Sequence, residues 1–257
     1  MKWDYLKSKQ FKLLVIWAVC VFFFLKAVFT VGDWRTASRD SAGLAPDPRQ
    51  VKEAVVAVYA ARTYNWRGYF AVHSWIATKE KNADYYTTYQ VIGFYLRRRG
   101  SALIIQRDIP DRYWYGEKPE LIEELRGEKA ERAIVQIKKL AAEYPYKQRY
   151  VPWPGPNSNT FVAHIIRNVD ELTVELPTLA IGKDWLDDGA FFGKAPSGRG
   201  WQFSLFGLLG VTLGINEGIE FNILGLNFGI DIRHPALKLP MIGRLGFDNK
   251  PENGTTD

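Results

Sequence analysis

One short segment, residues 154–161, constrains the local fold of this chain more than any other. It reads Pro-Gly-Pro-Asn-Ser-Asn-Thr-Phe, so that a rigid turn leads into residue types that cap helices well. Apolar side chains then recur at helical spacing, at Phe161, Ile165 and Ile166. The segment therefore predicts a helix whose first turn carries the hydroxyl of Ser158.

Two interpretations of Ser158 are open. In the first, Ser158 and its neighbours Asn157 and Asn159 cap the helix, because their side chains satisfy backbone amides that lack a partner in the first turn. In the second, Ser158 is a nucleophile, and the amide of Asn159 and the positive end of the helix dipole stabilise the developing negative charge. A serine hydroxyl is a poor nucleophile unless a base contacts it, so the second interpretation requires a base elsewhere in the chain.

The chain has three histidines that could act as this base, namely His73, His164 and His234. His73 lies between apolar neighbours in residues 69–78, whose alternating pattern predicts a strand. Its default role is that of a half-buried structural histidine with one hydrogen-bonded ring nitrogen. An imidazole with an ordinary pKa of about 6.5 can also accept a proton at neutral pH, so a role as general base is the alternative.

Cysteine use excludes several chemistries. The only cysteine is Cys20, in an apolar N-terminal segment, so the globular part has no disulfide, thiolate metal site or thiol nucleophile. The spacing of the histidines matches no zinc motif, and the acidic cluster of Asp184, Asp187 and Asp188 is typical of a solvated loop. We therefore expect no bound metal and no cofactor.

The N-terminal residues 11–32 predict a transmembrane helix. Their apolar run is long enough to span a bilayer if Lys26 extends toward the head groups. A cleaved signal peptide is the alternative, but no small-x-small cleavage site precedes Asp33. The lysines before the run slightly exceed the arginines after it, which predicts a cytoplasmic N-terminus and an exported globular part.

Charge argues against a nucleic-acid partner. The net charge is +6, and the residues before position 13 carry half of it. The remaining part is only mildly basic, whereas nucleic-acid binding needs a concentrated basic surface. The dense cluster at 97–99, Arg-Arg-Arg, is typical of a solvated turn between strands, with a contact to lipid or phosphate as the alternative.

The order of patterns along the chain predicts an α+β protein with four regions. These are an N-terminal membrane anchor (1–32), a linker (33–46), an α+β core (47–195) and a β-rich C-terminal extension (196–250). Within the core we expect a helix that begins near Asp47 and runs to Ala61, followed by strands and then a helical region that breaks at Gly127. The expected strands cover 69–78, 85–96, 102–106 and 112–115, and the helical region covers 119–143.

The Gly-rich C-terminal extension predicts a β meander of three strands. Apolar and polar residues alternate in it, and the phase of the alternation switches beside Gly225, which indicates a β-bulge. We expect its apolar side chains to form an ordinary β core, with a position close to the membrane as the alternative. The three expected strands cover 201–213, 219–232 and 237–247.

The segment Asn157-Ser158-Asn159-Thr160-Phe161 resembles the nucleophile segment of the PPPDE peptidases, Asn-Cys-Asn-Thr-Phe, with serine in place of cysteine. Residues 72–76 and 112–116 resemble the histidine strand and the aromatic strand of the same enzymes. This likeness covers about residues 65–170 and implies the circularly permuted papain-like fold of the PPPDE and LRAT type, an antiparallel sheet packed on helices. The whole chain also resembles a membrane-anchored bacterial family of unknown function that has Trp-Pro-Gly-Pro-Asn-Ser-Asn-Thr-Phe at its centre, which is residues 153–161 here.

The resemblance implies a membrane-anchored, exported hydrolase or acyltransferase in the bacterial inner membrane. It would use His73 as base and Ser158 as nucleophile, and Gln90 or Thr88 on the neighbouring strand would orient the imidazole. Residues at the groove would bind a peptide, glycan or acyl substrate of the envelope, namely Asn157, Asn159, Trp75 and Trp114. Because a hydroxyl ionises far less readily than a thiol, the alternative is a catalytically inactive papain-like binding or structural envelope protein.

Overall fold

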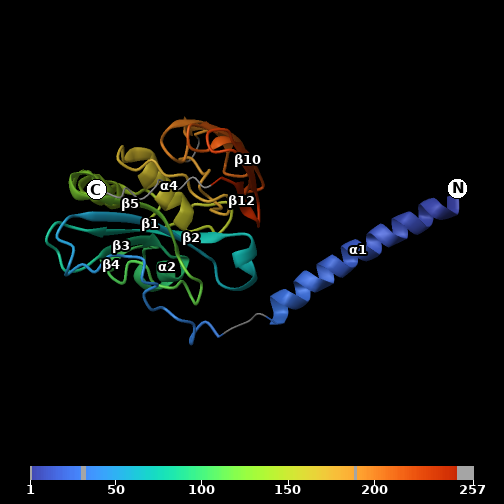
Figure 1. The fold of residues 1–257 in the computed structure, drawn as a ribbon, viewed down its shortest axis with the longest axis horizontal. Helices are drawn as coiled ribbons and strands as arrows, with labels where there is room; N and C mark the ends of the chain where they lie inside the picture. The colour runs from blue at the N-terminus through green and yellow to red at the C-terminus, as the bar shows by residue number, and fades with distance from the viewer. Residues whose placement is uncertain (1, 30–32, 188–189, 248–257) are drawn as a thin grey trace.

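Two antiparallel sheets and four α-helices form the protein (Figure 1). The computed structural model describes residues 2–29, 33–187 and 190–247, and the counts refer to these residues. Helix α4 (Ser158–Asn168) packs on the first sheet, and the second sheet lies on the other side of this helix (Figure 1). The predicted α+β class is confirmed.

The first sheet has five strands in the order β4-β3-β2-β1-β5. Helices α3 (Gly127–Glu143) and α4 cover one face of it, where the larger hydrophobic core lies. The other face carries a smaller apolar cluster, against which parts of the segment before β1 and of the segment before β5 pack. The strands are β1 (Val55–Arg62), β2 (Val72–Lys79), β3 (Thr87–Val91), β4 (Leu103–Arg107) and β5 (Glu120–Arg126).

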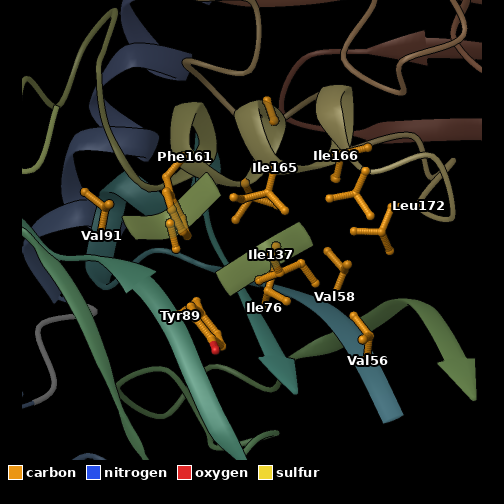
Figure 2. Close-up of a cluster of buried hydrophobic side chains, with 14 of the residues drawn as sticks. Val56, Val58, Ile76, Tyr89, Val91, Ile137, Phe161, Ile165, Ile166 and Leu172 are labelled. Carbon is orange, nitrogen blue, oxygen red and sulfur yellow. The ribbon is translucent and has the colours of Figure 1, made fainter. Parts of the chain in front are cut away.

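Side chains from α4 and the strands interlock in the larger core (Figure 2). Phe161, Ile165 and Ile166 point from α4 toward the sheet, where they meet side chains that include Val58 and Ile76. All five are at most 1 % exposed. The helical spacing seen in the sequence therefore marks the face of α4 that the core buries, and the predicted helix is confirmed.

The helix predicted from Asp47 to Ala61 is wrong. Asp47 accepts hydrogen bonds from the backbone of Arg49 and Gln50, but this turn does not continue into a helix. Residues 55–62 instead form β1, which lies between β2 and β5 and is buried on both faces. A strand buried on both faces loses the alternation that identifies strands, and its valines and alanines imitate a helical stripe.

Other expected elements are confirmed in part. Strands β2 and β4 lie where strands were predicted, and α3 begins at Gly127. The segment before Gly127 is strand β5 rather than helix, and the second half of the strand predicted over 85–96 is the short helix α2 (Gly93–Arg99). Residues 112–115 form only isolated bridges, and a 3-10 helix, η1 (Asn65–Tyr69), precedes β2.

The N-terminal residues form one long helix, α1 (Lys2–Phe29), which stands away from both sheets in Figure 1. Side chains along it are exposed, among them Phe11, Ile16 and Trp17. Within the described residues, no helix combines the length and the apolar character needed to cross a membrane. The predicted helical conformation of this segment is confirmed, but the prediction of a transmembrane helix finds no support.

The second sheet is a seven-stranded meander rather than one of three strands. The phase switch beside Gly225 is a tight hairpin and not a bulge, because Leu226 pairs directly with Ile223. Its strands follow chain order across the sheet, from β6 to β12. They are β6 (Phe192–Lys194), β7 (Gly200–Leu205), β8 (Leu209–Gly214), β9 (Gly218–Ile223), β10 (Leu226–Asp231), β11 (Ala236–Leu239) and β12 (Gly243–Gly246).

A buried charge network ties the second sheet to the rest of the protein. The ammonium of Lys183 lies 2.6 Å from Glu220 on β9 and 3.2 Å from Asp184. Lys238 on β11 lies 3.2 Å from Glu220 and also pairs with Glu175. Burial acts to lower the pKa of Lys183, but the charges of Asp184 and Glu220 outweigh it and raise this pKa above its ordinary value.

Candidate functional site

The turn before α4 ends in a capping box. The side-chain oxygen of Asn157 accepts hydrogen bonds from the amides of Asn159 at 2.9 Å and Thr160 at 3.2 Å. The hydroxyl of Thr160 accepts a hydrogen bond from the amide of Asn157 at 3.1 Å. These contacts satisfy amides of the first turn, so the capping interpretation of this segment is confirmed.

The same residues join α4 to the first sheet and to the loop at 181–182. The side-chain amide of Asn159 donates to the carbonyls of Val72 on β2 and Ile181, at 3.0 and 2.8 Å. Its oxygen accepts from the hydroxyl of Ser74 at 2.8 Å. We call Ser74, Asn157, Asn159 and Thr160 the α4 junction. Because the side chains of Asn157 and Asn159 already bond to the protein, their expected role in binding substrate has no support here.

Gly182 is required at the α4 junction. A Cβ atom there would lie 2.5 Å from the side-chain nitrogen of Asn157, and the backbone φ of +96° disfavours any other residue. We expect Gly182→Ala to lower the free energy of unfolding by about 3 kcal/mol, because strain and steric conflict add.

Gly43→Ala is the matched control for this change. Gly43 has a φ of +69°, and no atom lies within 4 Å of the place that a Cβ would occupy there, so only the backbone strain of about 1 kcal/mol applies. Urea unfolding of both variants measures the difference. Equal losses would show that Asn157 does not restrict the space beside Gly182.

Ser158 occupies the first position of α4 and is 5 % exposed. Its hydroxyl has no hydrogen bond with any residue that the structure describes. The amide of Asn159, expected to stabilise an oxyanion, already donates to Asn157. The first turn of α4 therefore offers a hydroxyl but not the amide donor that the catalytic interpretation assigned to Asn159.

His73 lies on the opposite face of β2 from the α4 junction. Successive side chains of a strand point to opposite faces, and the neighbouring Ser74 contacts Asn159 on α4. The imidazole of His73 instead stacks on the ring of Trp114, with 3.6 Å between ring centroids. No hydrogen bond joins His73 to Ser158 in the described part of the chain, so the predicted dyad is not assembled in this structure.

Gln90, predicted to orient His73, and Trp75 and Trp114, predicted to bind substrate, lie around the imidazole. Its Nε2 lies 3.2 Å from the side-chain oxygen of Gln90, so that Gln90 orients the imidazole as expected. Trp75 lies beside the imidazole, with 5.8 Å between ring centroids and 6.3 Å to the ring of Trp114, and it donates its indole N–H to the carbonyl of Pro110. Thr88, the other candidate for orienting His73, donates to the carbonyl of Gln106 instead. Trp114 therefore covers one face of the imidazole, and Trp75 lies at its side.

Burial controls the charge of His73. The side chain is 6 % exposed, and loss of solvent lowers its pKa from about 6.5 to about 4, although the hydrogen bond with Gln90 opposes this shift. The imidazole is therefore neutral at pH 7. Since Trp114 stacks on one face of the ring and the side chain is almost fully buried, a substrate has no direct approach to the ring, and its arrangement is that of a structural histidine.

A cavity of about 240 Å³ lies on the side of α4 that faces away from the core of the first sheet, and we call it the α4 pocket. Its walls include the rings of Tyr144, Tyr146 and Trp185, and His164 of α4. The hydroxyl of Tyr144 and the indole N–H of Trp185 are buried and have no hydrogen-bond partner among the described residues. Burial also lowers the pKa of His164, against the opposing effect of Asp187.

Arg167 also lines the α4 pocket, and its guanidinium joins several of the segments around it. It donates to the carbonyls of Lys183 and Trp185 and to the side-chain oxygen of Gln202 on β7. These bonds hold residues 183–185, α4 and the second sheet in fixed positions around the cavity. Sequence reasoning missed this pocket because its residues lie far apart along the chain, and only the unassigned His164 indicated it.

Metal binding has no support in the geometry. Within the described residues, no group of three or more His, Cys, Asp or Glu side chains could hold a metal ion. The acidic Asp184 is not part of a solvated loop as expected, since it is buried and lies 3.2 Å from Lys183. Asp187 is exposed beside the α4 pocket, and Asp188 lies outside the described residues.

Comparisons with known proteins add one finding. A family model described as "Protein of unknown function (DUF3750)" matches residues 53–185, which is more than half of the chain. Searches of curated proteins and of solved structures found no match. The matched residues contain the whole first sheet, the α4 junction and Trp185 of the α4 pocket, but not the second sheet. The chain belongs to the DUF3750 family of proteins of unknown function.

Proposed function

We propose that this protein binds a small molecule in the α4 pocket through hydrogen-bond acceptors on that molecule. One observation carries the proposal: the side chains of Tyr144 and Trp185 line the same cavity, and each carries a buried donor that has no partner among the described residues. A buried donor without a partner costs about 1–3 kcal/mol, so two of them in one cavity favour a ligand or water that accepts both. This proposal develops the binding-protein alternative that the sequence left open.

The cavity limits the class of ligand. A volume of about 240 Å³ is below the range of about 300–1,000 Å³ that is typical of drug-sized ligands, so it suits one sugar ring or one amino acid. The rings of Tyr146 and Trp185 offer apolar surfaces, and the exposed Lys194 and the imidazole of His164 add donors. Glycan and peptide units of the envelope, the classes expected from the sequence, are therefore the first to test.

The indole N–H of Trp185 gives a direct signal of binding. The chain has nine tryptophans, and Trp185→Phe assigns one indole signal in a ¹⁵N–¹H spectrum. We expect a member of a panel of N-acetylated monosaccharides and N-acetyl amino acids to move this signal to lower field as it accepts the hydrogen bond. We also expect Tyr144→Phe to weaken that binding about tenfold, equivalent to about 1.4 kcal/mol.

Tyr85→Phe is the matched control, because Tyr85 is exposed on the surface away from the pocket. It should leave binding unchanged. Tyr144→Phe should not lower the free energy of unfolding, since its hydroxyl has no partner among the described residues. A panel that leaves the Trp185 signal in place, or a large loss of stability in Tyr144→Phe, would contradict the proposal.

A hydrolase or acyltransferase that uses Ser158 is a second proposal. It is supported by the hydroxyl of Ser158, which makes no hydrogen bond with the described residues and lies in the first turn of α4. Because His73 points to the other face of β2, this proposal requires a different base. Labelling by a fluorophosphonate that is lost in Ser158→Ala would favour it over the binding role.

A further inference from the structure

The second sheet turns its apolar side chains outward. Trp201 on β7 is 76 % exposed, Phe221 on β9 is 50 % exposed and Ile230 on β10 is 57 % exposed. Side chains at alternate positions of neighbouring strands join them in one surface, which we call the apolar face. It consists of Phe192, Trp201, Phe203, Leu205, Leu209, Leu213, Ile219, Phe221, Ile223, Phe228, Ile230, Leu237 and Leu245.

The inner face of the same sheet is polar, which is the reverse of an ordinary β core. Buried positions that alternate with the apolar face hold Gln202, Glu220, Asn222 and Lys238. Glu220 and Lys238 belong to the buried charge network with Lys183, so ion pairs fix the orientation of the sheet. A shift of register by one residue would expose these partners and break the network. The expectation of an ordinary β core in this region is therefore wrong.

The apolar face is too large for an ordinary monomer surface. Its large side chains, each exposed by a third or more, sum to on the order of 1,000 Å². Typical monomers have a largest apolar patch of about 300–600 Å², and larger ones mark sites of interaction. The face therefore requires a covering partner.

Charge indicates which partner fits. The exposed charges of residues 190–247 are all positive, from Lys194, Arg199 and Arg233. The acidic residues of the same segment, Glu217, Glu220 and Asp231, are all buried. A second copy of the chain would bring cations toward cations with no exposed carboxylate from this segment to pair with them. An anionic lipid surface supplies both the apolar layer and the negative charge.

A groove at the end of the apolar face combines an apolar lining with positive charge. It has a volume of about 520 Å³ and is lined by Leu213, Ile215, Ile219 and Ile232. Arg199 and Arg233 also line it, and neither forms an ion pair within 4 Å among the described residues, although the charge of Arg199 acts on the buried Glu123. An acyl chain matches the lining of this groove, and a phosphate matches the two arginines.

We propose that the apolar face binds the surface of an anionic lipid bilayer and that the groove between Arg199 and Arg233 holds the phosphate of a lipid. Trp201 and the other large side chains of the face enter the interface between head groups and acyl chains, as amphipathic surfaces do. The second sheet thereby orients the first sheet and the α4 pocket relative to the lipid surface. This proposal does not depend on the ligand of the α4 pocket.

A fluorophore placed on the face tests contact directly in the full chain. Cys20→Ser removes the native thiol, and Ile223→Cys provides a site for an environment-sensitive label on β9. The matched control is Ile105→Cys on β4, where Ile105 is 47 % exposed compared with 50 % for Ile223. This comparison separates the apolar face from any binding by helix α1, because only a label that enters lipid changes its emission.

We expect the label at position 223 to shift to shorter wavelength and to gain intensity several-fold with phosphatidylglycerol-containing vesicles. The label at position 105 should not respond to either kind of vesicle, and vesicles of phosphatidylcholine alone should give only a weak response at position 223. Arg199→Gln with Arg233→Gln should weaken binding to anionic vesicles about tenfold or more, since each cation near an anionic surface contributes about 1 kcal/mol. Arg97→Gln with Arg98→Gln is the matched control, because it removes two cations from the first-sheet side of the protein.

Three results would overturn the proposal. The first is no response at position 223 with either vesicle. The second is an equal response to anionic and neutral vesicles, because this would remove the role of the arginines. The third is a blue shift at position 223 that rises with protein concentration without lipid, together with dimers in sedimentation, because a second copy of the chain would then cover the face.

Discussion

Replacing Lys183 by methionine is expected to lower the free energy of unfolding by about 3–5 kcal/mol at pH 7. The ammonium of Lys183 is fully buried and lies 2.6 Å from Glu220 and 3.2 Å from Asp184. Without it, two buried carboxylates lose their closest cation in a region that excludes water. The effect is large because the uncompensated charge remains, rather than because the ion pair itself is strong.

Lys81→Met is the matched control for this prediction. Lys81 pairs with Glu131 at 3.3 Å, but both side chains are largely exposed, so its loss should cost at most about 1 kcal/mol. Urea unfolding of the two variants and the wild type measures both values. A loss in Lys183→Met that is no larger than the loss in Lys81→Met would show that the second sheet does not depend on the buried charge network.

The stability of the protein is expected to fall by roughly 3 kcal/mol through His73 alone as the pH is lowered from about 6.5 to about 4. The folded protein holds the pKa of His73 at about 4, below the ordinary value of about 6.5 in the unfolded chain. Between these values the unfolded chain binds a proton that the folded protein does not. Lowering the pH therefore favours unfolding, and the contribution is complete only above pH 6.5.

His73→Phe isolates this contribution, because phenylalanine can still stack on Trp114 but does not titrate. Glu123 acts in the opposite direction, since burial raises its pKa to about 7, but it titrates alike in both proteins and cancels in the comparison. The unfolding free energy of the wild type minus that of the variant, measured between pH 7 and pH 4, should fall as the pH falls. A difference that is independent of pH would mean that His73 is exposed to solvent, and a difference that rises as the pH falls would mean that it is paired with an anion.

The helix at Ser158 was predictable because its signals are local. The cap at Asn157 and the spacing of Phe161, Ile165 and Ile166 act within one helical segment, and the structure confirms both. Strand β1 was not predictable for the opposite reason. Its place in the middle of a sheet depends on contacts with β2 and β5, which bury both of its faces and remove the alternation.

The separation of His73 from Ser158 could not be read from the sequence. Alternation places His73 and Ser74 on opposite faces of β2, but both faces of this strand are buried. Val72 and Ile76 are apolar on one face, while Trp75 and Ala77 are apolar on the other, so hydrophobicity did not indicate which face α4 covers. The contact between Ser74 and Asn159 settles that question in the folded protein.

The second sheet shows a different limit of sequence reasoning. The alternation of Ile219, Glu220, Phe221 and Asn222 predicted a strand, and β9 confirms it. The usual preference of apolar side chains for the interior then predicted the wrong face. Ion pairs between residues far apart in the chain, such as Lys183 and Glu220, reverse that preference and leave Phe221 exposed.

The central claim is that His73 contacts Gln90 and the tryptophan rings but not Ser158. The ¹⁵N chemical shifts of the His73 imidazole test it most directly, in the wild type and in the variants Ser158→Ala and Gln90→Leu. We predict a neutral ring with the proton on Nε2 down to about pH 5, shifts that change in Gln90→Leu, and none that change in Ser158→Ala. An imidazole that titrates near pH 7 and responds to Ser158→Ala would contradict the claim and restore the catalytic dyad.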